Sequence, residues 1–414
     1  MLEIVRAVAR QLVFSILLDY KYIFIYLFFY LVVKGRYEII QGFEQCVTKC
    51  RTRTLRQLLE ELILTGLITG FAGGILTVAL GLYIEPDGLQ AFLIIMVLLA
   101  FINHRFINPS YAGGIISIYA LISDYDRIHV PSMLTLIAVV QLMEAVLIYL
   151  NRKHDNIPIF IQHDGKLTGA FIKQKYYAVP FMMLTLSAIP YAVWNTTINL
   201  NWGTIFKTGL LASGNAVFFL TGAIGVTNYS SIAISSLPEE KCRNDAIKFL
   251  AGSLLLLIIA FFSGKNEVFK WIGAIFALLY RETIFQITLY RERTRQPLYT
   301  VAQRGLRILE IIPGGTADKM KMKRGEIILT VNGKPVQTED GIRHALSKSP
   351  TFIWMHTEAP DGQIKIYEHK CYPDGVKDLG VILVPKEWEV TYQVDEYENF
   401  TIIKNIVDKF RFKR

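Results

Sequence analysis

The histidines of the chain decide whether it encodes a metal-dependent hydrolase. Zinc proteolysis requires two histidines on one helical turn with a glutamate base between them, in the pattern H-E-x-x-H. The seven histidines are His104, His129, His154, His163, His344, His356 and His369. No two of them lie four residues apart, so the sequence argues against zinc chemistry of this kind.

Other residues with catalytic potential also lack the necessary neighbours. The chain has neither a G-x-S-x-G nucleophile turn nor a G-x-x-x-x-G-K-[ST] phosphate loop. Ser347 and Lys348 are adjacent on an expected helix, which is not a Ser/Lys dyad arrangement. Cys46 and Cys50 lie four apart without a matching Cys or His pair, so free thiols are expected. We therefore predict a protein that is not an enzyme and binds no cofactor and no metal.

One acidic residue, Glu144, lies inside the long apolar run 131–150. Ionisable groups within membrane segments mark transport pathways in many proteins. A single acid is weak evidence for an ion pathway, because Glu144 could also reach the membrane surface or pair with a lysine. A transporter-like membrane region therefore stays an alternative hypothesis.

Composition indicates a membrane protein. Of 414 residues, 52% are hydrophobic and 19% charged, and the long apolar runs all precede residue 290. The N-terminal run contains Asp19 and Lys21 and is not typical of a cleaved signal peptide. The net charge is +9, but the basic residues cluster beside apolar runs, so membrane topology explains them better than nucleic-acid binding.

Eight runs approach the roughly 20 residues that a helix needs to cross the hydrocarbon core. The expected spans are 62–84, 89–104, 110–123, 131–150, 177–194, 206–227, 245–263 and 268–289. Residues 1–33 form either one more span or an interfacial helix with a short membrane segment. The fold class is therefore a polytopic α-helical membrane domain of eight to nine spans. Gly66-x-x-x-Gly70 has the spacing that allows close helix approach.

Basic residues in alternate loops predict which ends of the spans face the cytoplasm. With segment 34–60 placed inside, nearly all loop Lys and Arg residues fall on the inner side, as the positive-inside rule requires. This places the region after residue 290 in the cytoplasm. Asp164-Gly165, between two apolar runs of the inner loop 151–176, predicts a β-hairpin. That hairpin could dock the C-terminal region or lie on the membrane.

The segment from residue 303 to 336 has the pattern of a small soluble domain. Strands are expected at 306–312 and 326–331, followed by turns at Pro313-Gly314-Gly315 and Asn332-Gly333. A helix is expected at 338–348, because Ile342, Ala345 and Leu346 share one helical face.

This order resembles the PDZ domain, in the variant found in bacterial proteases. The run from Met322 to Gly333 is similar to the family core L-x-x-G-D-x-I-x-x-V-N-G, with Met322 and Glu326 as mild departures. Arg304 to Ile308 resembles the family's carboxylate-binding loop. The resemblance implies a groove in which a peptide adds as a strand to the sheet edge. The groove residues would be Gly305, Leu306, Arg307, Ile308, Ile342, Ala345 and Leu346.

Four regions follow from these patterns. They are an N-terminal membrane or interfacial segment with a basic loop (1–60), a polytopic transmembrane domain (61–290), a small α+β PDZ-like domain (298–386) and a C-terminal tail (387–414).

The whole arrangement resembles the MinJ family of membrane adaptors in the Gram-positive Min cell-division system. The run from Arg105 to Gly114 and the hairpin around Asp164-Gly165 are similar to segments of that family. The resemblance implies a multi-pass protein of the cell membrane, enriched at septum and poles, that links a DivIVA-like polar scaffold to a MinD-like ATPase.

The function predicted from the sequence is a non-enzymatic membrane-anchored adaptor that binds cytoplasmic proteins through its PDZ-like domain. Its partners would be cytoplasmic proteins and the lipid bilayer, without nucleic acid. The alternatives are a transporter-like protein regulated by the PDZ-like module, and an accessory subunit of a separate membrane protease.

Overall fold

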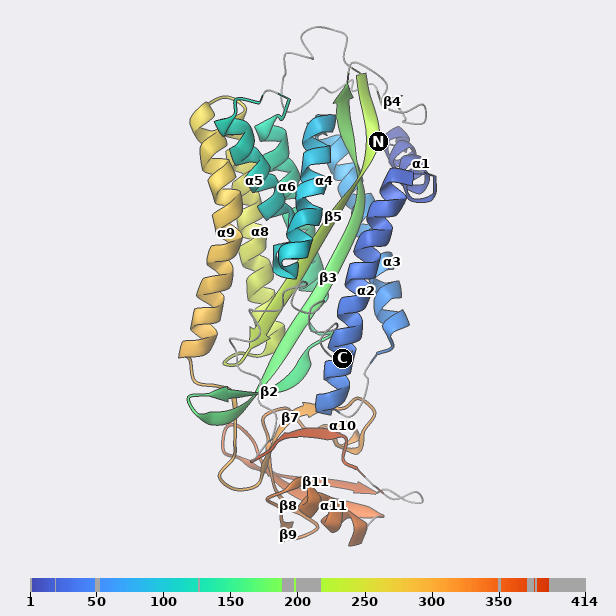
Figure 1. The fold of residues 1–414 in the computed structure, drawn as a ribbon. Helices are drawn as coiled ribbons and strands as arrows, with labels where there is room; N and C mark the ends of the chain where they lie inside the picture. Colours follow the sequence, from blue (N-terminus) through green and yellow to red (C-terminus); the bar gives the residue numbers. More distant parts are fainter. Residues whose placement is uncertain are drawn as a thin grey trace, which may run out of the picture.

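The computed structural model describes residues 2–386 except 19, 49–52, 126, 188–196, 199–216, 349–350, 371–375 and 377. The expected tail, 387–414, lies outside the described residues. Helices and a long β-hairpin form the upper part of the molecule, and a small sheet domain lies beneath them (Figure 1).

The helices of the upper part stand side by side along its long axis (Figure 1). Their bounds are α1 (Leu2–Leu17), α2 (Tyr20–Thr48), α3 (Leu55–Ala79), α4 (Pro86–Ile102), α5 (Pro109–Ile122), α6 (Val130–Leu150), α8 (Pro238–Ser263) and α9 (Glu267–Thr294). By length and composition, α3, α6, α8 and α9 could each cross a membrane, and α4 and α5 are shorter apolar helices. Helix α6 is the most enclosed of these and packs against α5, α8 and α9.

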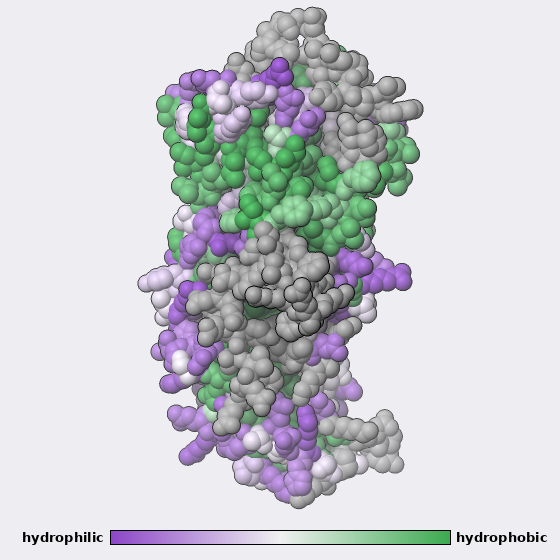
Figure 2. Space-filling view, in the orientation of Figure 1, coloured by the Kyte–Doolittle hydropathy of each residue, from purple (hydrophilic) through white to green (hydrophobic). Residues whose placement is uncertain are grey.

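On the face that Figure 2 shows, exposed apolar side chains form a belt across the upper half of the molecule, and the described residues of the lower half are mostly polar. The belt includes Leu27 on α2, Ile68 on α3, Ile94 on α4 and Leu254 on α8. Large apolar surfaces of this kind are rare on soluble monomers. The belt therefore marks the surface expected to contact lipid.

Two of the eight expected spans are wrong. Residues 177–187 and 217–227, within the expected spans 177–194 and 206–227, belong to strands β3 (Lys166–Ser187) and β5 (Val217–Ala233). They pair antiparallel from Phe171↔Ala233 to Ser187↔Val217 and run obliquely between the helices (Figure 1). The expectation failed because strands buried on both faces are continuously apolar, a pattern that periodicity does not separate from a buried helix.

A sheet edge inside a membrane must have its backbone groups covered, because lipid supplies no hydrogen bonds. Helix α3 covers the outer edge of β3 through Gly66 and Gly70, where a Cβ atom would collide with the carbonyls of Ala178 and Pro180. Pro180 has no N–H to leave unpaired. The Gly66-x-x-x-Gly70 spacing thus serves contact between a helix and a strand edge.

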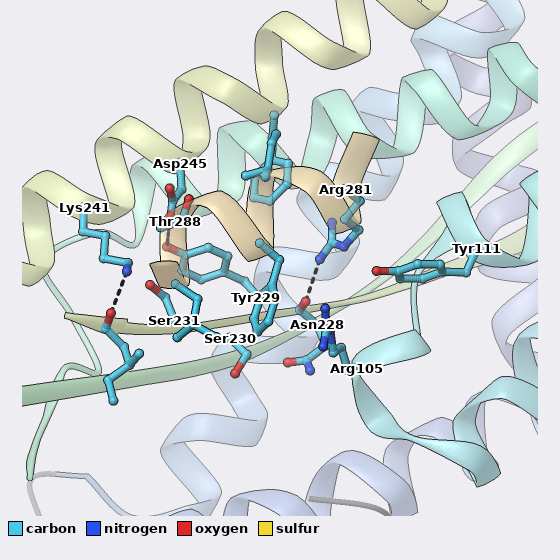
Figure 3. A pocket seen from close by; sticks show the side chains of 15 residues that line it. Arg105, Tyr111, Asn228, Tyr229, Ser230, Ser231, Lys241, Asp245, Arg281 and Thr288 are labelled. Carbon is cyan, nitrogen blue, oxygen red and sulfur yellow. Dashed lines mark hydrogen bonds between the residues drawn. The ribbon is translucent and has the colours of Figure 1, made fainter. Parts of the chain in front are cut away.

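Side chains and short strands complete the covering of this hairpin. Thr77 Oγ1 donates to the carbonyl of Met182 at 2.7 Å, and β1 (Tyr83–Ile84) pairs parallel with β3 one step further along. On β5, the carbonyls of Asn228 and Ile232 accept bonds from Arg281 and Lys241, as Figure 3 shows. The hairpin is therefore held by backbone and side-chain contacts on both of its edges.

The predicted hairpin at Asp164-Gly165 is confirmed. β2 (Ile157–His163) pairs antiparallel with the first part of β3, and both turn residues have positive φ, 49° and 73°. This part of β3 also pairs with β6 (Tyr299–Thr300), which follows α9. The lower end of the hairpin thus joins the helical part to the C-terminal domain.

The C-terminal domain is an antiparallel sheet with two helices. Its elements are β7 (Leu306–Ile311), α10 (Thr316–Lys319), β8 (Ile327–Val331), β9 (Lys334–Pro335), α11 (Glu339–Lys348), β10 (Phe352–Glu358), β11 (Ile364–Lys370) and β12 (Val381–Val384). The strand order is β11-β10-β8-β7-β12, and β9 pairs with β8. The two strands and the helix expected for this domain are confirmed as β7, β8 and α11.

Candidate protein-binding edge and its support

The open edge beside helix α11 belongs to β12. β12 is the last strand in the sheet order, so its outer edge pairs with no other strand in the described part of the chain. Leu379 and Leu383 lie in one apolar core with Ile342, Ala345 and Leu346 of α11. The edge and the helix therefore share an apolar floor.

Strand register shows which backbone groups point outward from this edge. Ile312 N donates to Gly380 O, and β12 pairs with β7 as Val381↔Ile311 and Ile382↔Glu310. In an antiparallel pair, hydrogen-bonded positions alternate with positions whose N–H and C=O point away from the partner strand. Gly380 and Ile382 face β7, so the N–H and C=O of Val381 face the open edge.

The structure places the predicted groove residues in two different settings. Leu306, Ile308, Ile342, Ala345 and Leu346 come together, all buried in the same core. β7, however, lies between β8 and β12 and is paired on both sides, so it is not the edge that an added strand could reach. Among the predicted groove elements, α11 keeps its place beside the open edge, and β12 takes the position assigned to β7.

Gly305 and Arg307 have local structural roles. Gly305 has φ +77°, and a Cβ there would collide with the carbonyl of Ile328. The Arg307 guanidinium donates to the carbonyls of Thr300 at 2.8 Å and Gly325 at 3.3 Å. Burial lowers the pKa of Arg307, with Glu358 acting in the opposite direction. Arg307 thus ties β7 to the linker from the helical region.

The sheet of the C-terminal domain packs against the hairpin of the helical region. The face that makes this contact is the one that carries Leu309 and Val384. Leu309 of β7 and Val384 of β12 form one buried cluster with Phe160, Phe171 and Tyr299. At Gly169 on β3, a Cβ would press against Leu309 and Val384. The close approach of the two parts therefore depends on a residue without a side chain.

Arg324 adds a charged contact to this interface. Its guanidinium pairs with Glu310 at 2.6 Å within the domain and with Glu239, at the start of α8, at 2.7 Å. The same group lies 5.3 Å from the centre of the Phe171 ring. Burial raises the pKa of Glu310, and Arg324 partly offsets that effect. Arg324 therefore links α8, β3 and the C-terminal domain.

A cluster of four charges lies above this interface, on the helical side. Lys175 of β3 is only 1% exposed and contacts Asp155 at 2.6 Å and Glu61 at 3.2 Å. Arg53 contacts the same two acids at 3.3 Å and 2.6 Å. Burial by itself would raise the pKa of Asp155, but Lys175 and Arg53 hold it below its usual value. A cavity of about 330 Å³ separates this cluster from Glu310 and Arg324.

Glu144 pairs with an arginine within the helical region. Its two oxygens accept bonds from both terminal nitrogens of Arg281 on α9, at 2.8 and 2.9 Å. Asn108 also donates to Glu144, and Arg281 donates to the carbonyl of Asn228 (Figure 3). Glu144 is 1% exposed and Arg281 7%. Through these bonds Arg281 connects α9 to α6 and to β5, so the bidentate pair has a structural role.

Sequence reasoning missed Arg281 as the partner of Glu144. It also missed Glu282, which pairs with Arg105 and accepts a bond from the Tyr111 hydroxyl at 3.0 Å. In the sequence, only resemblance points to the run from Arg105 to Gly114, and the structure gives its polar residues partners on α6 and α9. Two adjacent charged residues, Arg281 and Glu282, lie inside an apolar helix, and this pattern could have indicated buried ion pairs.

Within the residues that the structure describes, no group of three His, Cys, Asp or Glu side chains is placed to hold a metal ion. Cys242 is a free and buried thiol. The other three cysteines, Cys46, Cys50 and Cys371, lie outside the residues whose side chains are described.

Comparison with known proteins gives a partial relationship. Over 91 residues the chain is 29% identical to the cell division topological determinant MinJ of Bacillus subtilis (strain 168), covering 22% of this chain and 23% of that protein. Over 88 residues it is 26% identical to a probable MinJ of Lacticaseibacillus paracasei, covering 21% of this chain and 24% of that protein. The match thus spans about a quarter of each relative's length. No protein-family model matches the chain.

Among solved structures, the PDZ domain of an SdrC-like protein from Listeria monocytogenes matches 20% of this chain and 93% of that chain. The sequence identity is 12% and the TM-score is 0.17.

Proposed function

We propose that the protein is a non-enzymatic adaptor, anchored in the cell membrane, that recruits partner proteins through the edge of β12 during the positioning of cell division. The named role of the MinJ relatives supports the link to cell division. The apolar belt and the four long apolar helices support membrane anchoring.

The observation that carries the proposal is the open edge of β12 beside α11. The outward N–H and C=O of Val381 would bond the main chain of an added strand. Alternate side chains of that strand would point toward the apolar floor formed by Leu383 and the α11 residues. Main-chain bonds would give affinity, and the floor would select an apolar side chain.

The finer parts of the proposal concern partner identity and location. By similarity to MinJ, the partners would be a polar scaffold of the DivIVA kind and an ATPase of the MinD kind. The domain would then lie in the cytoplasm, and the protein would be enriched at septum and poles.

Val381 provides the test. Val381→Pro removes the outward N–H, whereas Val381→Thr keeps it with a side chain of similar shape. We expect cross-linking in intact cells, followed by pull-down and mass spectrometry, to lose partners with Val381→Pro and to retain them with Val381→Thr. Equal recovery of partners with both variants would contradict binding at this edge. Circular dichroism of the purified variants checks that the domain stays folded.

The same experiment tests the accessory-subunit hypothesis, and the structure bears on the transporter hypothesis. Recovery of a membrane protease with its substrates would favour the accessory-subunit hypothesis. The transporter hypothesis loses its main residue, because Glu144 is bound on both oxygens by Arg281. No described feature favours transport over anchoring.

A further inference from the structure

An apolar cavity of about 400 Å³ opens on the side of the helical region. It lies between α1, α2 and α3, and its inner wall is the β-hairpin. The wall includes Tyr30 and Val33 of α2, Leu62 and Leu67 of α3, and Pro180 of β3. These side chains come from α2, α3 and β3, and Ile16 of α1 and Ile224 of β5 complete the wall.

The surface around this cavity is the surface expected in contact with lipid. Leu27 and Leu31 on α2 and Ile63, Leu64 and Ile68 on α3 are exposed. The cavity therefore opens toward acyl chains, which are the natural occupants at this depth in the membrane. A transmembrane helix is about 10 Å across and would not fit a cavity of this volume.

Arg36 of α2 lies just beyond the residues that line the cavity, on the side of the C-terminal domain. It follows Val33 by three residues on α2, so the two share a face of the helix. Side chains on a helix tilt toward its N-terminus, which directs Arg36 back toward Val33 and the cavity. Tyr176 of β3 belongs to one buried cluster with Val33 and Leu62, two residues that line the cavity.

The burial of Arg36 is unusual because it has no acidic partner. Its side chain is 6% exposed, and no hydrogen bond or ion pair joins it to any residue in the described parts of the chain. The nearby cations Arg53 and Lys175, by contrast, are both paired with Glu61 and Asp155. A buried charge is costly unless it is paired, so the position of Arg36 favours an anion that lies outside the described residues.

From these two observations we propose that the cavity is a binding site for an anionic phospholipid of the leaflet on the side of the C-terminal domain. One acyl chain fills the apolar cavity along Tyr30, Leu67 and Pro180, and the phosphate pairs with Arg36. This inference does not depend on the proposed adaptor role.

The experiment uses the full chain in nanodiscs of phosphatidylcholine with a minor share of phosphatidylglycerol. Native mass spectrometry then measures which lipid stays bound to the released protein. We expect wild-type protein to retain phosphatidylglycerol about tenfold over its share in the disc, as a charge-assisted hydrogen bond in a buried site would give. Arg36→Gln should lower this enrichment to the share in the disc.

Two further variants sharpen the result. Arg56→Gln, at an arginine whose side chain is 87% exposed and paired with Glu60, should keep the enrichment. Leu67→Trp fills the cavity and leaves Arg36 in place, so it should reduce retention of both lipids. It also tests the site if Arg36→Gln does not fold, as judged by gel filtration.

Three outcomes would overturn the proposal. The first is equal retention of the two lipids by wild-type protein, and the second is unchanged enrichment in both Arg36→Gln and Leu67→Trp. The third is displacement of the bound lipid by millimolar inorganic phosphate, which would reduce the site to a simple anion site at Arg36.

Discussion

At the residue scale, Glu144 and Arg281 show how a buried charge becomes part of a membrane fold. Their separation in sequence is 137 residues, and each is nearly inaccessible. Glu144 could be recognised from the sequence as an unusual acid in an apolar run. Its partner could not, because nothing local in a sequence specifies a contact between two helices that far apart.

Removing one member of this pair should be more harmful than removing both. Arg281→Met leaves the Glu144 carboxylate buried without its cation, which should cost about 3–5 kcal/mol in the free energy of unfolding. The double variant Glu144→Met with Arg281→Met should recover much of that loss. Thermal unfolding in detergent, followed by tryptophan fluorescence, measures both. Equal destabilisation by the single and double variants would argue against this account.

Asp155 should make stability depend on pH in the acidic range. Its pKa in the folded protein is below the usual value of 3.8. A carboxyl group with a lowered folded-state pKa adds stability that is fully present above its unfolded pKa and disappears as the pH falls through its folded pKa.

The variant Asp155→Asn isolates this contribution. We expect it to lower the unfolding temperature at pH 7, at a cost of about 1–3 kcal/mol, since it leaves Lys175 with one acid fewer. Below about pH 4 the difference from wild type should shrink. A difference that stays constant from pH 7 to pH 3 would contradict the assigned role of the carboxylate.

At the scale of elements, the β-hairpin inside the helical region is the main departure from expectation. Its apolar length predicted two membrane helices. Pro180 is the fourth residue of the expected span 177–194, and a helix tolerates proline in its first turn, so it did not exclude a helix. The glycine spacing on α3 was recognised correctly as a contact surface, but the sequence alone could not show that its partner was a strand.

Two helix glycines allow a matched test of that contact. Gly70→Ala places a methyl group against the carbonyl of Pro180, so α3 or β3 must shift, at a cost of about 1–3 kcal/mol. Gly35→Ala on α2 meets no atom within 4 Å and should stabilise by about 0.5–1 kcal/mol. Unfolding temperatures of the two variants should therefore move in opposite directions. Stabilisation by Gly70→Ala would show that α3 does not lie against the strand edge.

In the C-terminal domain the sequence predicts the elements themselves but not which strand forms the open edge. The turn glycines and apolar spacing predicted β7, β8 and α11 with nearly correct bounds. The strand at the open edge was assigned to β7, because the segment before it resembles a carboxylate-binding loop. β12 lies about 70 residues later in the chain, and only the folded sheet shows that it, rather than β7, is the edge strand.

At the scale of the whole molecule, Arg324 should control how firmly the C-terminal domain is attached. Arg324→Ala removes the contacts to Glu239 and Phe171 while leaving the apolar cluster of Leu309 and Val384 in place. We expect faster proteolytic cleavage between residues 295 and 305, because the domain separates more often from the hairpin. Arg343→Ala, at an exposed arginine, is the control and should be cleaved like wild type. Equal cleavage of the two variants would show that Arg324 does not hold the domain.

The length of β3 has a consequence for any partner that the domain meets. The strand has 22 residues, which at about 3.3 Å each span about 70 Å, roughly twice the hydrocarbon thickness of a bilayer. One end lies among the membrane helices, and the other pairs with the linker strand and carries the domain. A domain on a flexible tether samples many heights above a membrane, whereas this one packs against the lower end of the hairpin through Leu309 and Val384. Only partners presented at that stand-off distance would meet the β12 edge.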